Sequence, residues 1–285
     1  MERAPLKCVR LSFAVSLAMV AACGDAAFVV APPSDAAADA TSHDAAREDG
    51  SDNDAADGAD GGTASRGCKA LPPALFCDDF DVGQVRVGGD AGPSWTSGHT
   101  RLGSYGVDTT QFVSPGYSFF ASTTSVDTGD FAQAFVRKTF APRTITDAAL
   151  DLQVRLPAAC GEAVVGTIRF ESAGEHYELQ IQLKATGISV NEITSAPAKP
   201  ETYVAHASPA IFPTGQWVRF RLELHVTSSS AGTVTLVQDS ATVLVTAVDL
   251  AYLDGAIATS AGIAYVGGKT GSCAAYFDNL WFDLK

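Results

Sequence analysis

One segment of the sequence, Trp217 to Val226, constrains the fold more than any other. Its apolar residues alternate strictly with polar ones: Val218, Phe220, Leu222, Leu224 and Val226 are interleaved with Arg219, Arg221, Glu223 and His225. Successive side chains of an extended strand point to opposite faces. This period of two therefore predicts a β-strand with one buried face and one polar face.

Similar alternation recurs through the C-terminal part of the chain, and no segment has a convincing helical period. Turn-rich pieces containing glycine or proline separate the runs. Many short strands without intervening helices predict an all-β, two-sheet antiparallel sandwich, and residues 67–285 suffice for a jelly roll of about a dozen strands or more. The other runs are Phe131–Phe140, Ala149–Leu156, Val164–Phe170, Tyr177–Lys184, Thr233–Gln238, Ala258–Val266 and Ala275–Leu284.

Residues 1–22 have the pattern of an export signal. A basic start is followed by an apolar run, Leu11 to Ala22, which is shorter than the about 20 residues that span a bilayer. The tetrad Val20-Ala-Ala-Cys23 resembles the lipobox of bacterial lipoproteins, which implies a lipid on Cys23. An ordinary cleavage site beside an unrelated cysteine is the alternative. The resemblance predicts a cell-envelope protein held on the periplasmic or cell-surface side by its lipid anchor.

The segment from Cys23 to residue 66 is expected to be a disordered tether. It is built from Ala, Asp, Gly and Ser, and residues 24–66 carry ten acidic and two basic side chains. Such a composition buries too little apolar surface to offset the entropy of ordering. The predicted organisation is thus a signal peptide (1–22), a lipidated tether (23–66) and a sandwich domain (67–285).

The charge of the sandwich domain limits its partners. Residues 67–285 contain 14 Lys and Arg against 21 Asp and Glu, a formal charge of −7. A domain of this sign is a poor fit to nucleic acid or to an anionic membrane surface. Neutral glycans, cationic partners and calcium remain compatible with it.

Four cysteines fall in the predicted domain: Cys68, Cys77, Cys160 and Cys273. In an oxidising compartment they allow three pairings. We favour Cys68–Cys77, which closes a short loop, together with Cys160–Cys273, which clips a middle loop to the last hairpin. Zinc is the rival interpretation, but no pair has the CxxC spacing and the histidines are scattered.

Three short motifs resemble the concanavalin A-like lectin/glucanase superfamily, including its laminin-G-like members. They are the opening Leu75-Phe-Cys-Asp-Asp-Phe-Asp81, the internal Gly215-Gln-Trp-Val-Arg-Phe-Arg-Leu-Glu223 and the closing Tyr276-Phe-Asp-Asn-Leu-Trp-Phe-Asp283. The resemblance implies a concanavalin A-like jelly roll over about residues 75–285. It also implies a structural calcium ion between the first and last strands, held by Asp79 or Asp81 and by Asp278. Aspartates that cap turns are the alternative.

The catalytic motifs of this superfamily are missing. Glucanases carry an E-x-D-x-E strand, which the sequence lacks. The nearest stretch, Glu175 to Glu178, sends its two carboxylates to opposite faces of a strand. Alginate-lyase-like members have Q-I-H where Gln180-Ile-Gln182 stands. These departures favour a protein without catalytic activity.

The polar strand faces supply the candidate binding residues. If their strands are neighbours in one concave sheet, these side chains would line a groove for a hydroxyl-rich ligand; a solvated sheet face with ion pairs is the alternative. Trp95, Tyr105, Tyr117 and Trp217 are candidates for stacking on sugars or for packing. The candidate ligand-binding residues are Arg169, Gln180, Gln182, Trp217, Arg219 and Arg221.

Two functions therefore compete. The preferred one is a cell-envelope module that binds polysaccharide or another cell-surface partner without turnover. The alternative is a divergent polysaccharide hydrolase or lyase that pairs His176 or His225 with Glu178 or Glu223 as acid and base.

Overall fold

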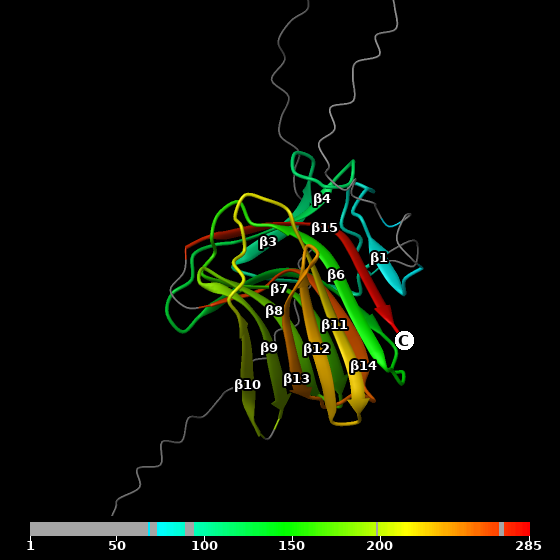
Figure 1. Cartoon of the computed structure of the whole chain (residues 1–285). Helices are drawn as coiled ribbons and strands as arrows, with labels where there is room; N and C mark the ends of the chain where they lie inside the picture. Colours follow the sequence, from blue (N-terminus) through cyan, green and yellow to red (C-terminus); the bar gives the residue numbers. More distant parts are fainter. Residues whose placement is uncertain (1–67, 69–72, 89–93, 198, 268–270) are drawn as a thin grey trace, which may run out of the picture. The chain divides into compact units, whose positions relative to one another are not determined.

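The computed structural model describes Cys68 and residues 73–88, 94–197, 199–267 and 271–285, which form a two-layered β-sandwich (Figure 1). The predicted signal peptide, Cys23 and almost the whole predicted tether lie outside the described residues. In the part of the chain that is described, no helix is long and apolar enough to cross a membrane.

Among the residues that the structure describes, fifteen strands form two antiparallel sheets, which confirms the all-β jelly-roll prediction. Figure 1 shows β6 between β11 and β15. The eight-stranded sheet has the order β13 (Ala241–Asp249), β12 (Ala231–Gln238), β11 (Val218–Ser228), β6 (Asp147–Arg155), β15 (Cys273–Leu284), β4 (Ser118–Thr123) and β3 (Gly103–Asp108), with β1 (Phe76–Asp78) also paired to β15. The seven-stranded sheet has the order β10 (Lys199–Ser208), β9 (Gly187–Ala196), β8 (Glu175–Lys184), β7 (Glu162–Ser172), β14 (Ala256–Gly267), β5 (Phe131–Phe140) and β2 (Ser97–Arg101).

The core lies between the two sheets and follows the alternation of the sequence. In β11, Val218 and Phe220 are buried, while Arg219 between them is exposed. In β8, Tyr177 and Leu179 are fully buried and face the core from the other sheet. Each such side chain contributes about 1.5–3 kcal/mol through removal of its apolar surface from water. The opposite, polar faces of both sheets are thereby left outside the core.

Two disulfides confirm the favoured cysteine pairing. Cys68 and Cys77 are bonded, and so are Cys160 and Cys273, across 9 and 113 positions of the sequence. Cys160 lies two residues before β7 of one sheet, and Cys273 is the first residue of β15 in the other. The longer bridge therefore ties the two sheets together at one end of the sandwich.

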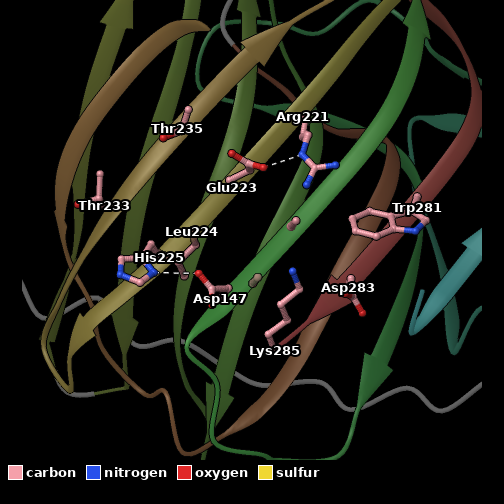
Figure 2. Close-up of a pocket in the computed structure, with 12 residues that line it drawn as sticks. Asp147, Arg221, Glu223, Leu224, His225, Thr233, Thr235, Trp281, Asp283 and Lys285 are labelled. Atoms are coloured by element: carbon pink, nitrogen blue, oxygen red, sulfur yellow. Dashed lines mark hydrogen bonds and ion pairs between the residues drawn. The ribbon is translucent and has the colours of Figure 1, made fainter. Parts of the chain in front are cut away.

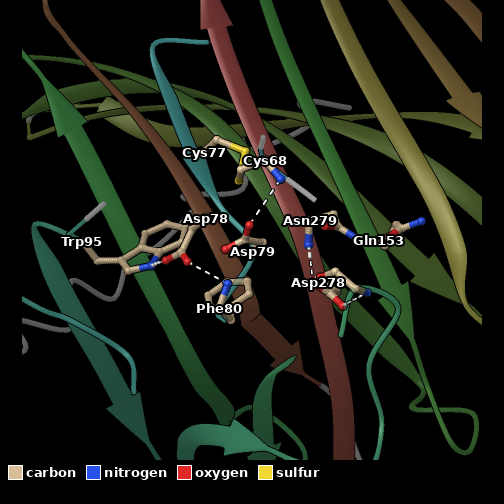
Figure 3. The surroundings of a disulfide bond; sticks show 10 residues. Cys68, Cys77, Asp78, Asp79, Phe80, Trp95, Gln153, Asp278 and Asn279 are labelled. Carbon is tan, nitrogen blue, oxygen red and sulfur yellow. Dashed lines mark hydrogen bonds between the residues drawn. A yellow bond between two sulfur atoms is a disulfide. The ribbon is translucent and has the colours of Figure 1, made fainter. Parts of the chain in front are cut away.

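The opening F-x-D-D-F motif anchors the start of the domain to the core (Figure 3). The buried Asp78 carboxylate accepts hydrogen bonds from Trp95 Nε1 at 2.8 Å and from the Phe80 backbone N–H at 2.9 Å. Trp95 is itself fully buried and stacks on Phe80. Burial raises the pKa of Asp78 to about 6, although both hydrogen bonds act in the opposite direction.

This raised pKa predicts a pH dependence of stability that Asp78→Asn removes. Between pH about 4 and 6 the folded protein holds a proton on Asp78 that the unfolded chain releases, so stability falls as the pH rises through this interval. The expected loss is on the order of 3 kcal/mol and is complete about one pH unit above the folded-state pKa of about 6. Urea unfolding at a series of pH values measures it. Asp79→Asn, at the neighbouring position, is the matched control and is expected to keep the wild-type pH dependence; equal curves for both variants would refute the assignment.

Candidate functional site

The structure divides the predicted polar residues between two faces that point away from each other. Arg169, Gln180 and Gln182 lie on β7 and β8 of the seven-stranded sheet, whereas Arg219 and Arg221 lie on β11 of the eight-stranded sheet. The condition for a single groove, that all these strands are neighbours in one concave sheet, is therefore not met. Alternation states which side of a strand is polar, but it does not state to which sheet the strand belongs.

A groove of about 730 Å³ runs over the outer face of the seven-stranded sheet. Strands β5, β7, β8, β9, β10 and β14 contribute to it, so it crosses most of the sheet. Its lining combines amides, aromatic rings and charged groups: Phe131, Gln133, Phe135, Arg137, Glu162, Arg169, His176, Glu178, Gln180, Gln182, Lys184, Ile193, Glu201, Tyr203, Ala264 and Tyr265.

A chain of charge-assisted contacts crosses the middle of the groove. Arg169 Nη1 donates to Glu178 Oε2 at 3.0 Å, directly across the β7–β8 pair, and Gln180 Nε2 donates to the other oxygen at 3.1 Å. Arg169 also forms an ion pair with Glu171, which lies 3.8 Å from Arg137. The Glu178 side chain is only 8% exposed, so these contacts hold it in place on the floor of the groove.

His176 lies beside this chain on β8. Burial lowers the pKa of its imidazole, and the nearby positive charge of Arg169 lowers the pKa further, while Glu178 and Glu171 act in the opposite direction. The neutral form of His176 is therefore favoured at neutral pH, and in that form its ring can accept a proton.

A second set of polar contacts occupies the part of the groove over β8, β9 and β10. The Gln182 carbonyl oxygen accepts hydrogen bonds from Asn191 Nδ2 at 3.0 Å, Ser189 Oγ at 3.3 Å and the Tyr203 hydroxyl at 3.3 Å. Gln182, Ser189 and Asn191 are buried. Because these partners fix one another, the polar groups are positioned before any ligand arrives.

Two exposed aromatic rings stand over this polar floor. Tyr203 on β10 is 52% exposed and Tyr265 on β14 is 40% exposed. Tyr265 stacks on Phe131, with ring centroids 5.8 Å apart. Exposed aromatic faces of this kind can pack against the C–H faces of sugar rings.

The opposite face carries a smaller hollow of about 300 Å³ on the eight-stranded sheet (Figure 2). In it Arg221 pairs with Glu223 at 2.7 Å, and His225 Nδ1 lies 2.8 Å from Asp147. Its aromatic residue, Trp281, is only 6% exposed, so its ring faces are not open to a sugar. The residues of the second predicted acid–base pair, Glu223 and His225, are thus not paired with each other: Glu223 pairs with Arg221, and His225 pairs with Asp147.

The two predicted tryptophans, Trp95 and Trp217, do not line the groove. Trp95 is fully buried in the core, which agrees with the packing alternative and not with stacking on a sugar. Trp217 directly precedes β11 and belongs to the lining of neither hollow. Arg219 forms an ion pair with Asp151 on β6 at 2.6 Å.

Hydrogen bonds from the protein occupy the carboxylate of Asp278, one of the three aspartates expected to hold calcium (Figure 3). Both oxygens of Asp278 accept two hydrogen bonds each, from the Val113 N–H, the Ser114 N–H and hydroxyl, and the Asn279 N–H. These donors use the lone pairs that a metal ligand would offer. Asp79 accepts a hydrogen bond from the Cys68 N–H. Among the described residues, no three His, Cys, Asp or Glu side chains form a group that could hold a metal ion.

No protein-family model matches this sequence, and a search of curated proteins finds no match either. Solved structures do match the fold. An endo-β-1,4-glucuronan lyase from the fungus Trichoderma reesei is 12% identical, with 75% of this chain and 96% of the lyase covered and a TM-score of 0.58. Alginate lyase Aly36B is 13% identical, with 75% and 98% covered and a TM-score of 0.50.

A carbohydrate-binding module, CBM66 from Bacillus subtilis, is 10% identical, with 66% of this chain and 96% of the module covered and a TM-score of 0.39. At these identities the likeness concerns the fold. The chain folds as a jelly-roll β-sandwich, and its structural neighbours are polysaccharide lyases and a carbohydrate-binding module.

Proposed function

We propose that this protein binds a polysaccharide chain in the groove of the seven-stranded sheet and does so without cleaving it. The observation that carries the proposal is the combination of fixed side-chain amides and exposed tyrosine rings along one groove. Amides offer both a donor and an acceptor, which matches the hydroxyl groups of a sugar, and the rings match its apolar faces.

The fold neighbours support the same class of ligand. The glucuronan lyase is named for a polysaccharide substrate, and its fold covers most of the sandwich described above. A groove across the sheet suits an extended chain better than a compact small molecule, because several strands contribute contacts along its length.

The proposal predicts a face-specific loss of binding. Tyr265→Ala and Gln180→Ala should each weaken retention of the full chain on polysaccharide gels about tenfold, since each removes one stacking face or one amide from the groove. Affinity electrophoresis against a panel of neutral and acidic polysaccharides measures the change. Val245→Ala is the matched control, because Val245 is an exposed apolar residue on β13 of the other sheet.

His225→Ala and Glu223→Gln extend this control to the opposite hollow. Both side chains lie on β11, away from the groove, and neither substitution is expected to change retention. If these variants weaken binding and the groove variants do not, the ligand-binding face has been assigned to the wrong sheet.

A second candidate function is β-elimination of an acidic polysaccharide in the same groove. The observation that favours it is His176, whose pKa is lowered by burial and by Arg169, beside an arginine that could face a uronate carboxylate. The assay is the ultraviolet absorbance of unsaturated ends released from alginate or glucuronan. Release that disappears in His176→Ala would replace the binding-only proposal with a lyase.

We also propose that the sandwich is displayed on the cell envelope by a lipid on Cys23. The two disulfides are consistent with maturation in an oxidising space. Cys23→Ser should move the protein from the membrane fraction to the soluble fraction, because stable anchoring needs more than one acyl chain and this change removes their attachment site. Fractionation with incorporation of a labelled fatty acid measures both effects. Unlabelled wild-type protein in the soluble fraction would contradict the anchor.

A further inference from the structure

We infer that the groove selects an uncharged polysaccharide over a polyuronate, an inference that rests on the proposed binding function. The lyases that share the fold are named for glucuronan and alginate, so a chain with this sandwich could bind either class. The distinction depends on whether the positive groups of the groove are available to a ligand carboxylate.

The central arginine is already paired with carboxylates of the protein. Arg169 lies between Glu178, at 3.0 Å, and Glu171, and its side chain is 19% exposed. A uronate that approached Arg169 would have to displace one of these partners or share the guanidinium with it. Displacement of Glu178 would leave its carboxylate, which is only 8% exposed, without a cation in a poorly hydrated site. An unpaired charge in such a site is unfavourable in free energy.

The other cations of the groove are balanced in the same way. Lys184 lies 3.6 Å from Glu162, and Arg137 lies 3.8 Å from Glu171. Along the whole lining, three cations (Arg137, Arg169 and Lys184) face three carboxylates (Glu162, Glu178 and Glu201), so the formal charge is zero. The domain around the groove carries −7, which repels a polyanion at long range.

The remaining groups of the groove match hydroxyls. Gln180 presents an amide from β8, where the neighbouring Gln182 amide is buried, and Tyr203 and Tyr265 present exposed rings from β10 and β14. None of these four side chains needs a charged ligand. A neutral chain also lacks the carboxyl group that makes the adjacent ring proton acidic, so a groove selective for it has no use for β-elimination chemistry.

The experiment compares the full chain on neutral and acidic polysaccharides in parallel. Laminarin, glucomannan and xylan form the neutral arm, and alginate and glucuronan form the acidic arm; affinity electrophoresis gives the dissociation constants at low and physiological salt. We expect at least one neutral polymer to bind more tightly than both polyuronates, with little dependence on salt, because no net charge is matched.

Glu178→Gln tests the mechanism by which uronates are rejected. It removes the buried partner of Arg169 with little change of shape, and it should shift the ratio of polyuronate to neutral affinity about tenfold toward the polyuronate, the effect of one freed charge-assisted hydrogen bond. Glu201→Gln is the matched control, since it removes the same charge from the same groove at an exposed position on β10. If Glu178→Gln does not fold, Glu171→Gln removes the other partner of Arg169 at a 33% exposed side chain.

Failure of the inference and failure of the proposed function give different results in this experiment. A polyuronate that binds the wild type as tightly as the best neutral polymer overturns the inference and leaves the proposed binding function intact. A Glu178→Gln shift no larger than that of Glu201→Gln overturns the role given to the Arg169–Glu178 pair. Failure to retain any polysaccharide overturns the proposed function and the inference together.

Discussion

Replacement of Cys160 and Cys273 by alanine is expected to lower the free energy of unfolding by about 3–5 kcal/mol. The bridge joins residues 113 positions apart, and a closed loop of this length removes about 4.7 kcal/mol of chain entropy from the unfolded state. It also connects the start of β7 in one sheet to the start of β15 in the other. Urea unfolding at fixed pH, with the free thiols absent from both variants, measures the loss.

The second disulfide provides the comparison. Cys68 and Cys77 are only 9 positions apart, so the same entropy argument gives about 2.5 kcal/mol for their replacement by alanine. The two double variants should therefore differ by about 2 kcal/mol, with the Cys160–Cys273 variant less stable. Equal losses, or a larger loss for Cys68–Cys77, would contradict the interpretation that the long bridge carries most of this stabilisation.

Glu192→Ala is expected to destabilise the sandwich by about 3–5 kcal/mol. Glu192 lies on β9 with its side chain only 9% exposed. Its carboxylate accepts hydrogen bonds from the Tyr177 hydroxyl at 3.0 Å and from the Asp249 N–H at 3.1 Å, and it lies 2.5 Å from His206 Nε2. Removal of the carboxylate leaves the buried Tyr177 hydroxyl without its acceptor, which costs more than the loss of an exposed hydrogen bond.

The position of Glu192 explains why the effect should extend beyond one strand. It joins β8, β9 and β10 of the seven-stranded sheet to the end of β13 in the eight-stranded sheet. His206 continues the connection through Thr246 of β13 at 3.0 Å, and Ser208 donates to the Val243 carbonyl oxygen at 2.8 Å. The edge strands β10 and β13 are therefore held together by polar contacts as well as by packing.

Glu223→Ala is the matched control for this prediction. Glu223 is also a strand glutamate with a cationic partner, but its side chain is 43% exposed, and pairs at such positions contribute about 0–1 kcal/mol. Thermal and urea unfolding of the two variants should separate them clearly. A Glu192→Ala protein as stable as Glu223→Ala would mean that the Tyr177 and Asp249 donors find other partners.

The sandwich could be predicted from local patterns because burial and strand geometry impose the same period of two. Strand β11 follows the alternation of Trp217 to Val226, and its apolar residues are those that face the core. Strand β10 (Lys199–Ser208) was not predicted, because nearly all its residues are exposed and an edge strand carries no apolar alternation. Strand β13 was missed for the same reason.

The sequence motifs that suggested the superfamily acquire a physical explanation. Asp78 in the opening motif holds Trp95 and the Phe80 backbone. In the closing motif, Asp278 fixes the loop at Val113 and Ser114, and Asn279 adopts a positive φ of 50° at the irregularity where β15 shifts its pairing with β6. Asn tolerates this conformation better than most residues. The acidic positions of both motifs thus serve local structure.

The candidate groove could be predicted only in part. Arg169, Gln180 and Gln182 were identified because they fall on the polar side of apolar strands. Tyr203 was not predicted because it lies on the edge strand β10, which was itself not predicted. Tyr265 was hidden because the alternation of β14 is interrupted near Gly262, where the pairing with β5 and β7 shifts register and φ is positive. Local periodicity could not show that Arg219 and Arg221 lie on the other sheet, away from this groove. Sheet membership depends on long-range strand pairing, which a local pattern does not contain.

The most direct test of the central claim is an NMR titration of side-chain amide resonances with a polysaccharide fragment that the protein retains. Gln180, Gln182 and Asn191 lie in or under the groove, whereas Gln153 and Asn279 are hydrogen-bonded to each other on the eight-stranded sheet at 2.6 Å. Binding in the groove predicts saturable shifts for the first three amides and none for the other two. Shifts confined to Gln153 and Asn279 would contradict the assignment of the binding site.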